Sequence, residues 1–112
     1  MEIYNKLVRD NIDTIINNNG KNELAVTRIL SDDEYKIELL KKLDEELMEL
    51  KEALLNGNIE DITEESADLI EVIRALNGNN LELVMQKLED KKRKKGGFTK
   101  KKYLEVVKKI NE

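Results

Sequence analysis

The sequence contains no cysteine, no histidine and no proline, and only 4% of its residues are aromatic. The absence of cysteine excludes disulfides, thiolate nucleophiles and zinc-thiolate sites. The absence of histidine removes the commonest general base and the commonest zinc ligand. Without proline, long helices can run uninterrupted, and so few aromatic side chains make a base-stacking surface for nucleic acid unexpected.

The chain is short and slightly acidic. Its 112 residues predict one domain, and its 20 basic side chains are outnumbered by 24 acidic ones. A nucleic-acid polymer is not an expected partner, because proteins that bind one usually carry a dominant basic surface. No apolar run approaches the roughly 20 residues of a membrane span, and no signal-peptide pattern is present, so a cytoplasmic location without membrane association is expected.

Apolar residues recur with helical spacing along most of the chain, which predicts an all-α fold. The strongest pattern begins at Ser31 and Glu34, which have the spacing of a capping box, and predicts a helix over residues 31–55. A second helix is predicted over residues 59–76. Because the connection at 56–58 is short, the two helices are expected to form an antiparallel hairpin. The apolar stripe of the first helix consists of Ile37, Leu40, Leu43, Leu47, Leu50 and Leu54.

Shorter patterns complete the expected architecture. Helices over residues 7–16 and 81–92 join the hairpin in a four-helix core, and residues 103–110 predict a short C-terminal helix after a basic loop at 91–98. Residues 23–30 fit either extended chain or a small strand. A leucine-rich hairpin has more apolar surface than two short helices cover, so a homodimer or homotetramer is expected.

Carboxylates fall into two spaced sets, with Glu45, Glu46 and Glu49 in the first hairpin helix and Glu65 and Asp68 in the second. Residues three positions apart project from nearly the same face of a helix. Glu46 with Glu49, and Glu65 with Asp68, can therefore present adjacent oxygens to one ion. Ligation by oxygen alone selects a hard cation, Mg²⁺ or else Mn²⁺.

The simpler interpretation of any one acidic pair is a solvated helix face, because a chain with 24 acidic residues contains many such pairs. Placement favours a metal site. At about 100° per residue, Glu46 falls roughly 60° and Glu49 roughly 120° from the centre of the apolar stripe, with Glu65 and Asp68 at corresponding offsets. The four carboxylates are expected to border the helix interface, where they repel one another unless a cation neutralises them. Glu45 lies about 100° further round and suits the positioning of a water molecule.

Together these acidic motifs resemble the signature of the MazG-like superfamily of all-α nucleoside triphosphate pyrophosphohydrolases. The segment Tyr-Asn-Lys-Leu-Val-Arg-Asp at residues 4–10 and the segment Lys-Gly-Gly-Phe at 95–98 resemble its phosphoribosyl-ATP pyrophosphohydrolase-like branch. Asn11 and Asp13 stand where that branch usually has a basic residue and a proline.

The resemblance implies Mg²⁺-dependent hydrolysis of a nucleoside triphosphate between its α and β phosphates, with non-canonical nucleotides as the substrates removed. It implies that Glu46, Glu49, Glu65 and Asp68 bind the metal. Glu45, from its place on the helix, is the candidate catalytic residue that positions the attacking water. Two other functions stay open. One is a phosphoribosyl-ATP pyrophosphohydrolase of histidine biosynthesis, and the other is a non-catalytic helical interaction module whose acidic residues are merely solvated.

Two basic groups are candidate ligands for the substrate phosphates. Lys94 and Lys95 precede the glycine pair at 96–97, whose flexibility could bring them over a triphosphate. The alternative is a solvated helix end, where cations interact favourably with the helix dipole. Lys6 and Arg9 form the second group, although bases three positions apart are also common on exposed helices.

Overall fold

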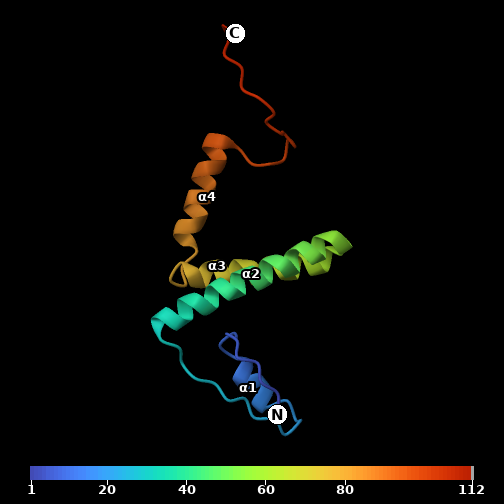
Figure 1. Ribbon diagram of the computed structural model, residues 1–112, viewed down its shortest axis with the longest axis vertical. Coiled ribbons are helices and arrows are strands. Elements are labelled where there is room, and N and C mark those ends of the chain that lie inside the picture. The colour runs from blue at the N-terminus through green and yellow to red at the C-terminus, as the bar shows by residue number, and fades with distance from the viewer. Residues whose placement is uncertain (112) are drawn as a thin grey trace. The chain divides into compact units, whose positions relative to one another are not determined.

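The computed structural model describes residues 1–111 and contains four helices and no strand in that part of the chain, which confirms the predicted all-α fold (Figure 1). The chain divides into two units, one formed by residues 1–79 and one that begins at residue 80. Over the same described residues, no helix combines the length and apolar character that crossing a membrane requires. The helices are α1 (Ile12–Asn17), α2 (Asp32–Asn56), α3 (Ile59–Leu76) and α4 (Glu82–Lys95).

Both ends of helix α2 are set by capping residues in its own sequence. The Ser31 hydroxyl accepts a hydrogen bond from the Glu34 amide (3.2 Å), and the Glu34 carboxylate accepts one from the Ser31 amide (3.1 Å), so the predicted capping box is confirmed. Gly57 ends the helix in the left-handed conformation at φ 73°. Asn58 then caps α3 by accepting a hydrogen bond from the Asp61 amide. This short connection folds α2 and α3 into the predicted antiparallel hairpin (Figure 1).

The buried residues of the hairpin lie on lines of residues spaced seven positions apart in the sequence. Leu39, Glu46 and Ala53 lie along one line of α2, because seven residues fall only about 20° short of two helical turns. Leu39 and Ala53 are buried, at 5% and 6% exposure. On α3, Glu65 and the buried Val72 have the same spacing. Two half-buried carboxylates therefore share these lines with the buried apolar residues.

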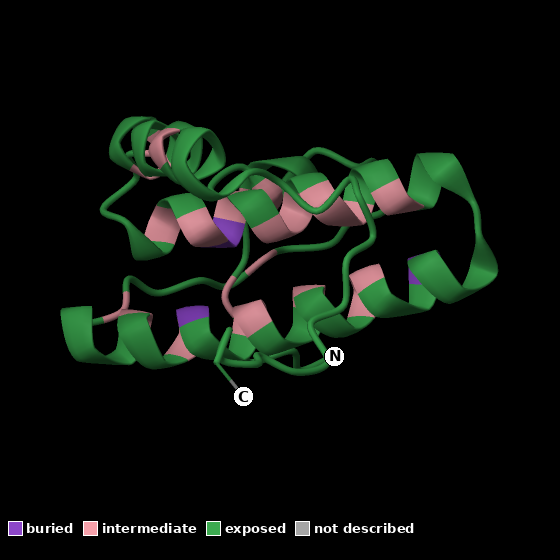
Figure 2. Cartoon of the chain, turned by 90° about the horizontal axis from the view of Figure 1, so that it is seen from above, coloured by how far each residue is buried: buried purple, intermediate pink, exposed green. Residues whose placement is uncertain are grey.

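This burial corrects the predicted position of the apolar stripe. Periodicity placed Leu40, Leu47 and Leu54 at the helix interface and the carboxylates at its margin. In the structure those leucines are 50%, 40% and 57% exposed. The buried and half-buried positions of α2 and α3 gather instead on the faces that the two helices turn toward each other (Figure 2), and Glu46 and Glu65 are among the half-buried residues. Helical periodicity identifies an apolar face but not which edge of it meets the neighbouring helix.

Helix α1 is shorter than the predicted helix over residues 7–16. It begins only at Ile12, after an N-cap, Asn11, whose side chain makes no capping bond, and Asn5 has a left-handed backbone at φ 47° that is not helical. Residues 23–30 have no regular secondary structure, so the small strand considered for them does not form. The first unit thus consists of the packed α2–α3 pair preceded by a short helix and extended chain.

In the second unit, the helices before and after the basic residues 91–95 differ from those predicted. Helix α4 runs to Lys95 instead of ending near residue 92, since four consecutive cations in its last turn interact favourably with the helix dipole. The helix predicted over residues 103–110 is wrong: these residues form none, because so short a helix is marginal unless its apolar face packs. The first unit contains α1, α2 and α3, and α4 belongs to the second unit, so the four-helix core stays a prediction.

Candidate metal centre

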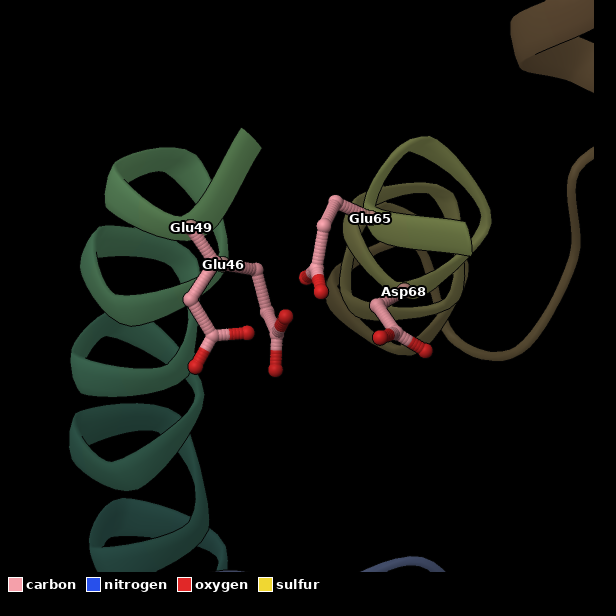
Figure 3. A group of neighbouring side chains, drawn as sticks. All are labelled: Glu46, Glu49, Glu65 and Asp68. Carbon is pink, nitrogen blue, oxygen red and sulfur yellow. The ribbon is translucent and has the colours of Figure 1, made fainter. Parts of the chain in front are cut away.

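Four carboxylates from α2 and α3 converge in the hairpin (Figure 3). Glu46 and Glu49 extend from α2, and Glu65 and Asp68 extend from α3 to meet them. Each side chain offers one oxygen, and these oxygens all lie within 4.8 Å of one another. All four residues are half-buried. The structure therefore brings together the four residues that the sequence predicted as metal ligands.

Two oxygens of this cluster lack hydrogen-bond donors. Oε2 of Glu46 and Oε2 of Glu65 are buried, and neither has a partner. A buried polar atom without a partner costs free energy, and the cost is larger when the group is charged. A hard divalent cation fits this set of donors, because carboxylate oxygens are the ligands that such cations take in proteins. The sequence has no histidine or cysteine that could compete as a ligand.

The crowding of carboxylates changes their protonation. Burial raises the pKa of Glu46 to about 7, helped by a hydrogen bond that its protonated form shares with Glu49 and by the charges of Glu49 and Asp68; nearby Lys42 opposes the rise. A shared hydrogen bond with Glu49 is the main cause that raises the pKa of Glu65, followed by burial and the same two charges. Without a metal, the cluster therefore retains protons near neutral pH.

We expect metal-free protein to lose stability as the pH rises from about 5 to about 8. The pKa of Glu46 is about 7 in the fold against an ordinary 4.5, so the folded state binds protons that the unfolded chain has released. This stabilisation is complete below the ordinary pKa and is lost as the pH passes through the folded value. Thermal unfolding in EDTA measures it, and Glu46→Gln should flatten the profile. A Tm that stays constant or rises over this interval in the unmodified protein would contradict the assignment.

An open groove adjoins the cluster at the turn end of the hairpin. Four of its side chains are carboxylates, two of which, Glu52 and Asp61, were not predicted as site residues. Glu52 follows Glu49 by three positions, and Asp61 precedes Glu65 by four, so helical spacing was the signal that could have identified them. An anionic ligand can occupy such a groove only with cations present. The lining residues are Glu49, Glu52, Ala53, Asn56, Asp61 and Glu65.

Three of the other predicted site residues are not among the four converging carboxylates. Glu45 is exposed on α2, and its Oε2 lies 3.4 Å from Nζ of Lys42. Lys94 and Lys95 are exposed in the last turn of α4, which belongs to the second unit. The catalytic role of Glu45 and the phosphate-binding role of the two lysines stay predictions.

The N-terminal basic pair divides between two environments. Lys6 places its ammonium group over the ring of Tyr4, 5.6 Å from the centroid. Arg9 instead reaches the acidic cluster, where its Nη2 donates a hydrogen bond to Oδ1 of Asp68 at 2.8 Å. Of this pair, Arg9 is the residue that the structure brings to the candidate metal site.

Comparisons of this chain with protein-family models, with curated proteins and with solved structures found no match. The chemical interpretation of the site therefore depends on the geometry described above. Four carboxylates held by two packed helices can bind one hard divalent cation, and the adjoining groove offers space for a ligand that brings further charge.

Proposed function

We propose that the chain is a Mg²⁺-dependent nucleoside triphosphate pyrophosphohydrolase of the MazG-like superfamily, which acts in the cytoplasm and removes non-canonical nucleotides. One observation carries the proposal. Carboxylates occupy positions of the α2–α3 core where apolar residues would stabilise the hairpin, and two of their buried oxygens have no donor. A fold keeps such a costly arrangement when a ligand makes use of it.

Glu46, Glu49, Glu65 and Asp68 would hold Mg²⁺, with Mn²⁺ as a substitute. When bound, the ion neutralises phosphate charge and polarises phosphoryl oxygens. The chain contributes rigidity, since all four side chains extend from packed helices instead of loops. Glu45, which is exposed on α2, remains the proposed catalytic carboxylate.

The proposed substrate is a triphosphate, which needs more positive charge than the acidic groove contains. Lys94 and Lys95 are proposed to supply part of it, because they stand at the end of a run of cations followed by two glycines. Gly96 has a left-handed φ of 80°, a conformation that glycine adopts without strain. Lys6 is a further candidate for the same role.

A screen for pyrophosphate release tests the function. The substrates are canonical triphosphates, modified triphosphates and phosphoribosyl-ATP, each assayed with Mg²⁺ and with EDTA. We expect a monophosphate and pyrophosphate as products, strict dependence on the metal, and preference for a modified nucleotide. Preference for phosphoribosyl-ATP would assign the chain to histidine biosynthesis instead. Release of orthophosphate alone, or no turnover, would contradict the proposal.

Exposed apolar side chains favour the second candidate, a non-catalytic helical interaction module. Leu55 and Ile59 are 87% and 79% exposed at the turn of the hairpin, and Leu83 of α4 is 67% exposed. Such surfaces are typical of proteins that bind a helical partner. The two candidates differ in the screen above, because an interaction module releases no pyrophosphate from any substrate.

We also propose that the chain forms a homodimer or homotetramer. Within the described residues only Leu39, Ala53 and Val72 are buried, which is a small core for a domain of this length (Figure 2). The exposed line of Leu40, Leu47 and Leu54 recurs every seven residues and would pack against the same line of a second copy. Light scattering should give two or four times the chain mass of 13.0 kDa, whereas a monomer would contradict this arrangement.

A further inference from the structure

The ion pair between Arg9 and Asp68 joins positions 59 residues apart and ties the N-terminal segment to α3. Nη2 of Arg9 lies 2.8 Å from Oδ1 of Asp68. The side chains are 58% and 39% exposed, so water competes for both partners and the pair is weak. A weak ion pair between distant segments can break when one of its two side chains binds a ligand more strongly.

Asp68 is also one of the four converging carboxylates, so its partner stands at the edge of the candidate metal centre. A divalent cation placed among the four oxygens and the Arg9 guanidinium would carry like charges and repel each other across Asp68. Arg9 and the metal therefore compete for this carboxylate. The guanidinium is nevertheless well placed for a neighbouring anion, because its planar set of five N–H donors matches the oxygens of a phosphate group.

We propose that Arg9 is a phosphate-binding residue which Asp68 holds at the site until metal and nucleotide arrive. With a divalent cation among the four carboxylates, Asp68 would be one of its ligands, and the released guanidinium of Arg9 would turn to the phosphates of the substrate. This inference rests on the proposed function, and it adds a positioning role for the N-terminal segment and an order of events. Arg9 weakens metal binding in the free protein and strengthens phosphate binding once metal is present.

Replacing Arg9 with glutamine should therefore shift two affinities in opposite directions. The Kd for Mn²⁺ alone, measured by titration calorimetry without nucleotide, should fall about 2- to 5-fold because an exposed ion pair no longer competes. The Kd for inorganic pyrophosphate at saturating Mg²⁺ should rise about 10- to 100-fold through loss of charge-assisted hydrogen bonds. A purely structural role would weaken both affinities.

Two control variants sharpen the test. Arg28→Gln removes another exposed arginine that forms an ion pair, with Glu34, away from the cluster, and it should change neither affinity. Arg9→Lys keeps the charge but loses the planar donor set, so it should leave Mn²⁺ affinity near that of the unmodified protein while pyrophosphate binds more weakly.

The outcomes separate this inference from the function on which it rests. Affinities that both stay unchanged in Arg9→Gln, or both weaken, would overturn the role of Arg9 while the metal-dependent function stands. Failure of the unmodified protein to bind Mn²⁺ would overturn the proposed function and this inference with it.

Discussion

Replacing Glu49 with glutamine is expected to abolish Mg²⁺-dependent pyrophosphate release while the helices stay folded. The carboxylate of Glu49 interacts with both Glu46 and Glu65, and it contributes to the raised pKa of each. Glutamine keeps the size of the side chain but replaces the carboxylate with a neutral amide, whose oxygen attracts a divalent cation less strongly. We expect kcat/KM to fall on the order of 10³-fold, equivalent to about 4 kcal/mol of transition-state stabilisation.

Asp44→Asn is the matched control for this prediction. It removes one negative charge from an exposed position of the same helix, outside the four converging carboxylates, and it should retain nearly full activity. Circular dichroism on both variants should show unchanged helix content. A Glu49→Gln enzyme with normal turnover would show that Glu49 has no part in the mechanism. Equal losses of kcat/KM in both variants would show that the loss comes from removing any one negative charge of the helix, and not from removing a metal ligand.

Replacing Glu46 with leucine is expected to stabilise the metal-free protein and to remove its response to Mg²⁺. Position 46 lies on the buried line between Leu39 and Ala53, so leucine would extend an apolar core and remove a carboxylate oxygen that lacks a donor. The gain should be about 1 kcal/mol, which for a domain of this size raises Tm by about 4–8 °C. Added Mg²⁺ should raise the Tm of the unmodified protein but not that of the variant.

Glu45→Leu is the control for this stability measurement, because it places the same apolar side chain at the adjacent exposed position. It should leave the metal-free Tm almost unchanged. Both variants are measured at one protein concentration, since self-association makes Tm depend on concentration. A destabilised Glu46→Leu protein would show that the carboxylate of Glu46 stabilises the fold. A Tm of this variant that still rises with Mg²⁺ would show that Glu46 is not a metal ligand.

The features that could be predicted from the sequence are those that neighbouring residues determine. The Ser31 capping box and the left-handed Gly57 set the ends of α2, and both are local patterns. The convergence of Glu46 and Glu49 with Glu65 and Asp68 also follows locally, because spacing by three selects a helix face and a short turn brings two such faces together.

The features that could not be predicted depend on contacts between distant segments. Apolar spacing could not show that α3 packs against the edge of α2 that carries Glu46, leaving Leu47 exposed. The pairing of Arg9 with Asp68 joins residues too far apart for any periodic pattern to connect. Residues 103–110 have helical spacing without a helix, because so short a segment depends on packing that the pattern does not specify.

A crystal structure with Mn²⁺ tests most directly the central claim that the four carboxylates hold one divalent cation. The account predicts a single anomalous peak between α2 and α3, with oxygens of Glu46, Glu49, Glu65 and Asp68 within about 2.6 Å of it, the outer limit for oxygen ligands of hard cations. The contrary result is an absent peak, or an ion bound by carboxylates of one helix alone while the other pair extends into solvent.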